Sequence, residues 1–126
     1  MIPLTNDEKI LAVRKIDGLD VDAGLKTIAN MVAPYLRVLG TFVRNVERDK
    51  DLLDNQLAAG NTEDFRTSVH GYKSALGNIG AIQLSEEAYK LEKAVIDNDR
   101  SFIDDNLPAF KEGIFKLAKS LEEILS

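Results

Sequence analysis

Residues 61–80 read NTEDFRTSVHGYKSALGNIG, and apolar side chains recur in this stretch at intervals of three and four residues. That spacing places them on one face of an α-helix, which advances about 100° per residue. The apolar face consists of Phe65, Val69, Tyr72, Leu76 and Ile79. Asn61 or Thr62 is suited to cap the first turn, and Gly80 is suited to end the last one. The stretch therefore predicts a helix with one buried face.

The same spacing occurs in most of the remaining chain, and no alternating strand pattern of useful length is present. We expect a long helix from Pro34 to Gly60, a helix capped by Ser85 and a last helix capped by Ser101. Pro108 should kink or divide the last helix. The buried faces of these three helices are predicted to contain Leu36, Leu39, Val43, Val46, Leu53 and Leu57; Leu84, Ala88, Leu91 and Val95; and Ile103, Leu107, Phe110, Ile114, Leu117, Leu121 and Ile124.

The amino-terminal region predicts shorter elements. Thr5 and Glu8 have the spacing of a capping box, and residues 20–30 have the pattern of a second short helix. Four long amphipathic helices joined by short polar turns predict an all-α fold, an antiparallel up-down-up-down four-helix bundle with one or two short N-terminal helices. We therefore divide the chain into a leader with a short helix, residues 1–18, and the bundle, residues 19–126.

Composition excludes several classes of function. The chain has 126 residues, a net charge of −5, one histidine and no cysteine. The acidic balance disfavours nucleic acid as a partner, and the absence of cysteine excludes disulfides, thiolate zinc sites and cysteine nucleophiles. Neither a signal peptide nor an apolar run long enough to span a membrane occurs, so we expect no direct membrane contact. This composition is compatible with the cytosol.

The single histidine, His70, lies on the predicted helix of residues 61–80. With Val69 at the centre of the buried face, four residues form a strip along its edge: Arg66, His70, Lys73 and Gly77. Ser74 lies beside this strip, closer to solvent. His70 is therefore predicted at the boundary of the core, with an accessible ring.

Small residues surround this histidine. Gly71 and Gly77 each cost a helix about 0.5–1 kcal/mol relative to alanine. They either allow two helices to approach closely or, with Ser74, open a docking surface around the imidazole. Lys73, three residues after His70, can turn its ammonium toward a phosphoryl group on the ring, and Arg66 can add charge at the edge. The strip thus suits a histidine that carries an anionic group.

Other interpretations are open at this point. A single histidine at a helix boundary is typically an ordinary surface residue. No Glu-x-x-His pair supports a di-metal site, because Thr67 stands three residues before His70, and one histidine without cysteine disfavours zinc. Ser68 and Ser74 lack an evident third group for a hydrolytic triad. A bundle that only binds partners, and an enzyme that uses the histidine as a general base, remain as alternatives.

The run from His70 to Ala81 resembles the signature of histidine-containing phosphotransfer (HPt) domains. His70 matches the phospho-accepting histidine, Lys73 matches the lysine that follows it, and Ile79, Gly80 and Ala81 match the end of the motif. The similarity extends over about residues 17–126. Two positions depart from the family pattern: Ser74 replaces the usual glycine, and Tyr72 replaces a common leucine or isoleucine.

The resemblance implies a phosphorelay intermediate without kinase activity of its own. His70 would accept a phosphoryl group from the phospho-aspartate of one receiver domain and pass it to another, and Lys73 would offset its charge. Arg66, Gly71, Ser74 and Gly77 would form the surface on which the receiver docks. The implied partners are response-regulator receiver domains and a sensor histidine kinase, whose C-terminal module this chain could be. No nucleotide-binding loop is present, and we expect Mg²⁺ only on the receiver, no tightly bound cofactor here and a cytoplasmic location.

Overall fold

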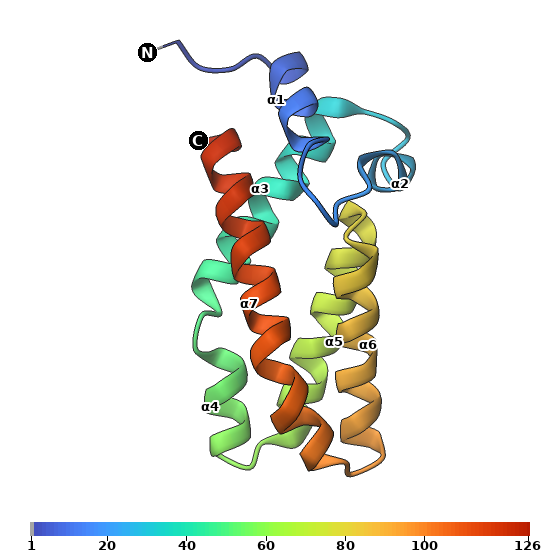
Figure 1. Ribbon diagram of the computed structural model, residues 1–126, viewed down its shortest axis with the longest axis vertical. Helices are drawn as coiled ribbons and strands as arrows, with labels where there is room; N and C mark the ends of the chain where they lie inside the picture. Colours follow the sequence, from blue (N-terminus) through green and yellow to red (C-terminus); the bar gives the residue numbers. More distant parts are fainter. Residues whose placement is uncertain (1) are drawn as a thin grey trace.

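The computed structural model describes residues 2–126, and within that range the regular structure is entirely helical, with no strand. Figure 1 shows the seven helices in order along the chain. Their bounds are α1 Asn6–Val13, α2 Val21–Lys26, α3 Val32–Arg48, α4 Leu52–Ala58, α5 Thr62–Ile79, α6 Ile82–Ile96 and α7 Arg100–Leu125.

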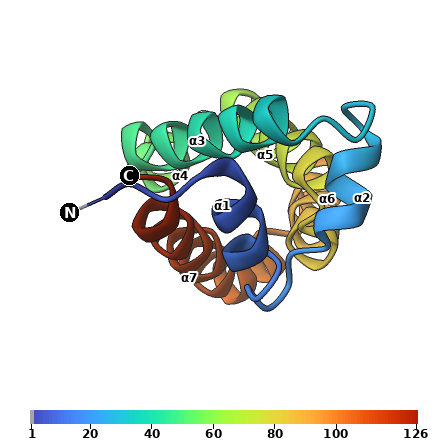
Figure 2. The ribbon, with the colours of Figure 1, turned by 90° about the horizontal axis from the view of Figure 1, so that it is seen from above.

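Four helical rods run alternately up and down: α3 continued by α4, then α5, α6 and α7 (Figure 1). Each rod packs against its neighbours, α4 on α5, α5 on α6, α6 on α7 and α7 on α3, which closes the ring. The short helix α1 packs on α3 and α7, and α2 packs on α5 and α3, at the end of the bundle seen from above in Figure 2. The predicted all-α bundle fold is therefore confirmed.

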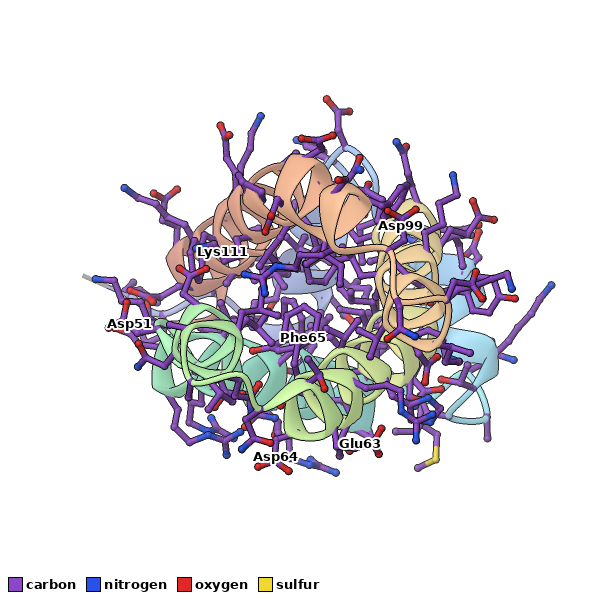
Figure 3. All side chains as sticks on the ribbon, turned by 90° about the horizontal axis from the view of Figure 1, so that it is seen from below. Asp51, Glu63, Asp64, Phe65, Asp99 and Lys111 are labelled. Atoms are coloured by element: carbon purple, nitrogen blue, oxygen red, sulfur yellow. The ribbon has the colours of Figure 1, made fainter. Side chains whose placement is uncertain are left out.

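The core contains one side-chain cluster to which every helix contributes. All five residues of the predicted apolar face of α5 are buried, and Phe65 lies at the centre of the ring viewed from below (Figure 3). Ile10 and Val13 of α1 are buried in the same cluster, so the first helix shares the core of the bundle. The largest side chains with almost no exposure are Tyr35, Phe65, Phe110, Leu39, Leu76, Ile79, Leu91, Ile114 and Leu121.

The expected long helix from Pro34 to Gly60 is wrong in one respect, because two helices occupy that stretch. α3 begins at Val32, ends at Arg48 and is separated from α4 by residues 49–51. Asp49 ends α3, and its carboxylate accepts hydrogen bonds from the Tyr72 hydroxyl and the Arg48 guanidinium. The polar run at 49–51 offers no apolar side chain to the core, and apolar packing resumes at Leu53.

Two helix starts and the effect of proline also differ from expectation. α6 begins at Ile82 rather than after Ser85, and Ser85 bonds to another helix instead of capping its own. Asp99, not Ser101, caps α7 by accepting a hydrogen bond from the backbone N–H of Phe102, the third residue of the helix. Pro108 does not divide α7. Proline removes one N–H donor from the helix, but α7 stays continuous because it packs against α3 and α6.

The upper end of α5 is fixed by residues distant in sequence. Gly80 ends the helix with φ 94°, a left-handed conformation that favours glycine. Its carbonyl accepts a hydrogen bond of 2.8 Å from the backbone N–H of Asp20, and the hydroxyl of Tyr35 donates to the carbonyl of Ile79 at 2.8 Å. A Cβ on Gly24 would lie 2.3 Å from the same Ile79 oxygen, so α2 sits on the helix end only because residue 24 has no side chain.

Candidate functional site

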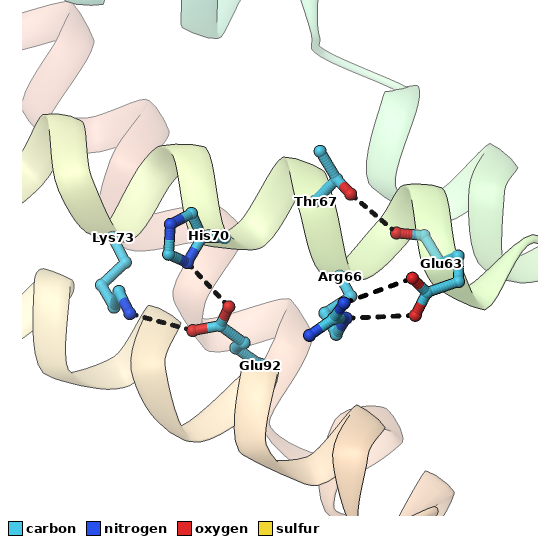
Figure 4. Close-up of polar contacts among 6 residues, drawn as sticks. All are labelled: Glu63, Arg66, Thr67, His70, Lys73 and Glu92. Carbon is cyan, nitrogen blue, oxygen red and sulfur yellow. Dashed lines mark hydrogen bonds and ion pairs between the residues drawn. The ribbon is translucent and has the colours of Figure 1, made fainter.

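The carboxylate of Glu92 connects the two predicted site residues of α5. Its Oε2 lies 2.7 Å from Nδ1 of His70, and its Oε1 accepts a hydrogen bond of 3.0 Å from Nζ of Lys73 (Figure 4). His70 and Lys73 stand one turn apart in the middle of α5, and Glu92 faces them from α6. The site is therefore built across the α5–α6 contact rather than on one helix.

The three side chains differ in their exposure to solvent. The His70 side chain is 55% exposed, that of Lys73 is 28% exposed and that of Glu92 is 12% exposed. The predicted accessible ring at the edge of the core is thus present in the fold. The carboxylate beneath it is shielded, so its interactions with the ring and the ammonium are screened less by water than those of a surface pair.

The ionisation of Glu92 determines the proton position on the ring. Burial by itself would raise the pKa of Glu92, but the hydrogen bonds from Lys73 and His70 and their charges together lower that pKa below its ordinary value. An ionised carboxylate only accepts hydrogen bonds. Nδ1 of His70 must therefore carry the proton in this contact, and in the neutral ring the lone pair is on Nε2.

Nε2 of His70 has no hydrogen-bond partner within residues 2–126. Figure 4 shows this nitrogen on the side of the ring away from Glu92. An exposed imidazole nitrogen with a fixed lone pair is a nucleophile open to attack on an electrophile brought by another molecule.

Three contacts hold Lys73 beside the imidazole of His70. Besides its bond to Glu92, its Nζ lies 5.4 Å from the centre of the Tyr89 ring, a cation–π distance. Its backbone carbonyl accepts a hydrogen bond of 2.7 Å from Oγ of Ser85, which fastens α6 to α5 at this level. The ammonium is thus held against the carboxylate that also contacts His70, rather than free in solvent.

The glycines of the predicted docking surface have different environments. Gly77 faces α6, where an added Cβ would lie 3.3 Å from Oγ of Ser85, so its small size serves the close approach of the two helices. The docking role expected for Gly77 stays a prediction. A Cβ on Gly71 would meet nothing within 4 Å, and Ser74 is also exposed.

Gly71 also borders a groove on the other side of α5. This groove, of about 290 Å³, lies between α5 and the α3–α4 junction and is lined by residues that include Thr67 and Ala75. Arg66, the remaining predicted docking residue, pairs with Glu63 through two hydrogen bonds of 3.1 and 3.3 Å (Figure 4). Arg66 lies one turn before His70 and is paired with Glu63. It makes no hydrogen bond to the imidazole.

Glu92 is the site residue that the sequence analysis did not identify. It lies 22 residues from His70, and no local spacing relates the two. The pattern of α6 gave one indirect signal: Glu92 directly follows the buried Leu91, at the edge of that helix's apolar face. Within residues 2–126 no group of three or more histidine, aspartate or glutamate side chains is arranged to hold a metal ion, and no helix combines the length and hydropathy needed to cross a bilayer.

Comparison with known families identifies the class of this bundle. The model of the Hpt domain matches residues 37–126, a range that contains α4 to α7 and most of α3, and the chain therefore belongs to the Hpt domain family. Hpt domains are histidine phosphotransfer modules of phosphorelays and have no kinase activity of their own. Searches of curated proteins and of solved structures found no significant match.

Proposed function

We propose that Nε2 of His70 accepts a phosphoryl group from the phospho-aspartate of a receiver domain and later passes it to the aspartate of another receiver. The observation that carries this proposal is the exposed imidazole whose Nδ1 is bound to Glu92 at 2.7 Å while Nε2 is open to solvent. The family membership supports the same chemistry. The protein would act as a covalent intermediate rather than as a kinase.

The transfer step follows from this geometry. The lone pair of Nε2 forms a bond to phosphorus, the bond between phosphorus and the aspartate oxygen breaks, and the aspartate leaves as a carboxylate with the electron pair. The ring gains positive charge as the N–P bond forms, because Nδ1 keeps its proton. Glu92, ionised and in contact with Nδ1, stabilises that charge, which is the role of a fixed carboxylate behind a reacting histidine. Transfer to the next receiver reverses these steps.

Lys73 would stabilise the phosphorylated form. A phosphoryl group adds roughly −1.5 to −2 charges at neutral pH, as estimated for other phosphorylated side chains. The ammonium is one turn away on a flexible stem and is bound to Glu92 in the free protein. The phosphoryl oxygens would therefore compete with Glu92 for Lys73, and the lysine would bridge both anions.

The receiver would approach from the side of α5 that is open. Gly71 and Ser74 present little bulk beside the ring, and the groove next to Gly71 can accept side chains of a partner. Mg²⁺ and the acidic residues that the reaction needs would come with the receiver, because phosphoryl transfer depends mainly on positioning and charge stabilisation. A sensor histidine kinase would supply the phosphoryl groups of the relay in the cytoplasm. This chain would be the C-terminal module of that kinase or a separate protein.

The test is a transfer assay with a phosphorylated receiver. The protein should acquire label that is lost in acid and stable in base, and the His70→Gln variant should acquire none while retaining its helical circular dichroism. Label that persists in His70→Gln would reject the site. A receiver that binds the protein without any transfer, under conditions in which its phosphoryl group is intact, would favour a bundle that only binds partners.

A further inference from the structure

A second groove lies away from the histidine, between α1, α3 and the end of α7. It has a volume of about 560 Å³. Figure 2 shows the three helices that border it. Three cationic side chains line it: Lys9 from α1, and Arg37 and Arg44 from α3. Among the described residues no aspartate or glutamate side chain lines this groove. The groove is therefore locally positive in a chain whose net charge is −5.

The two arginines of this groove differ from the others in the chain. Every other arginine has a carboxylate within 3.1 Å: Arg14 pairs with Asp22, Arg48 with Asp49, Arg66 with Glu63 and Arg100 with Asp104. Within residues 2–126, neither Arg37 nor Arg44 has a carboxylate within 4.0 Å, and the same holds for Lys9. Arg44 donates instead to the hydroxyl of Thr41 at 3.0 Å.

The three cations are placed so that one anion can contact all of them. Arg37 and Arg44 are seven residues apart, so they share one face of α3, about 10 Å apart along the helix axis. Lys9 adds a third positive charge from α1, with its Nζ 3.5 Å from the carbonyl oxygen of Leu125. Like charges gathered on one surface repel each other, and a multiply charged anion relieves that repulsion.

The floor of the groove leaves room for such a ligand. Gly40 lies on α3 between the two arginines, and a Cβ there would be 3.5 Å from Nη1 of Arg44. A larger side chain at this position would therefore fill the space beside the guanidinium. Ala33 and Leu36 supply the apolar part of the floor. The volume falls within the range of about 300–1,000 Å³ that is usual for small-molecule sites.

We propose that this groove binds an oligophosphate anion, with the forked guanidinium groups of Arg37 and Arg44 on its oxygens and Lys9 on the opposite side. Guanidinium groups bind phosphate oxygens in pairs, and three cations match an anion of about three negative charges. The phosphates could belong to a soluble small molecule or to lipid headgroups, since both present the same oxygens. The site uses helices other than those of His70 and is independent of phosphotransfer.

The test is calorimetric titration of the purified protein with inorganic triphosphate. The expected result is saturable binding at one site, weakened about tenfold or more by Arg37→Ala and by Arg44→Ala, the loss typical of one charged hydrogen bond. Lys119→Ala removes one exposed, unpaired charge from α7 outside the groove and should bind as the wild type does. Gly40→Leu should abolish binding without changing the charge.

Two further arms identify the site and the source of the phosphates. The His70→Gln and Lys73→Ala variants should bind triphosphate normally, which separates this groove from the phosphotransfer site. Sedimentation with vesicles of phosphatidylcholine that contain a phosphoinositide bisphosphate, compared with pure phosphatidylcholine, tests the headgroup source through the same arginine variants. The proposal is overturned when neither probe binds, or when Arg37→Ala and Arg44→Ala bind no more weakly than Lys119→Ala. Circular dichroism and thermal unfolding verify that each variant is folded.

Discussion

Oε2 of Glu92 lies 2.7 Å from Nδ1 of His70, so a residue of α6 holds the imidazole of α5 in one orientation. The same carboxylate binds Nζ of Lys73 through its other oxygen. The contact keeps the proton on Nδ1 and the lone pair on the exposed Nε2. Packing between two helices therefore selects the nitrogen that we propose to react.

Replacing Glu92 should impair transfer more than stability. Glu92→Ala removes the acceptor from Nδ1 and the charge that stabilises the ring, and we expect transfer from a phosphorylated receiver to slow by about tenfold or more, the effect of one charge-assisted hydrogen bond. Glu92→Gln keeps an acceptor but loses the charge and should fall between wild type and Glu92→Ala. Single-turnover kinetics measure the rates.

A spectroscopic measurement separates positioning from a general packing effect. Nitrogen NMR of the free wild-type protein should show the tautomer of His70 with the proton on Nδ1, whereas Glu92→Ala should show a mixture of both neutral tautomers. Equal tautomer populations in the two proteins would contradict the assigned role of Glu92.

Lys73→Ala should shorten the lifetime of the phosphorylated protein or slow its formation. The ammonium shares the carboxylate of Glu92 with His70, and its loss leaves the added phosphoryl charge without that partner. We expect an effect of about tenfold with little change in the free energy of unfolding. Lys90→Ala, which removes an exposed and unpaired cation from α6, is the matched control. Identical decay rates in both variants would show that Lys73 has no part in the site.

Alanine at the two glycines of α5 should give different stabilities. Gly71→Ala adds a methyl group in open space and should raise the free energy of unfolding by about 0.5–1 kcal/mol, because alanine is the better helix former. Gly77→Ala places its Cβ 3.3 Å from Oγ of Ser85, and this crowding should cancel part or all of that gain. Urea unfolding of both variants measures the difference, and an equal gain at both positions would refute the packing role of Gly77.

Pro108→Ala should stabilise the protein. Pro108 is exposed in the interior of α7, where it supplies no N–H to the preceding turn. Alanine restores that hydrogen bond and the better helix propensity, for an expected gain of about 1–3 kcal/mol in the free energy of unfolding. A loss of stability measured in urea would mean that the helix bends at Pro108 in a way the packing of α7 requires.

Tyr35→Phe should lower stability and change its dependence on alkaline pH. The buried hydroxyl donates to the carbonyl of Ile79, and its loss should cost about 1–3 kcal/mol. Burial raises the pKa of Tyr35 to about 12 from 10.0, a change to which Asp20 adds and which Arg14 opposes. The raised pKa means that the folded state binds the tyrosine proton more tightly than the unfolded state does. The stabilisation by the protonated hydroxyl is therefore complete below pH 10 and is lost as the pH rises from 10 toward 12.

The comparison with Tyr35→Phe makes that pH effect measurable. The difference in free energy of unfolding between wild type and Tyr35→Phe should be constant at neutral pH and shrink above pH 10. Tyr89→Phe, at a tyrosine that is 51% exposed, is the control and should have little effect on the free energy of unfolding. A constant difference up to pH 12 would contradict the link between burial and ionisation of Tyr35.

Features encoded by local spacing were predictable, whereas features that depend on distant partners were not. The buried face of α5 and the exposed edge position of His70 follow from helical periodicity, because that helix has one side in the core along its length. The break between α3 and α4 at residues 49–51 was not predicted, because the hydrogen bond to Asp49 comes from the hydroxyl of Tyr72 on another helix. Ser85 is a residue type that often caps a helix, yet α6 already begins at Ile82 and the Ser85 hydroxyl donates to the carbonyl of Lys73 on α5.

By itself the sequence determined the class of fold, the helix that carries the histidine and the side of that helix on which it lies. These properties depend on the order of apolar and polar residues within about four positions, which fixes how a helix buries one face. Only the tertiary structure decided that Glu92 binds both His70 and Lys73, that Gly77 serves packing while Gly71 is open, and that Arg37 and Arg44 share a groove with Lys9. Those relationships depend on how the helices pack together, and this places side chains in contact whatever their separation along the chain.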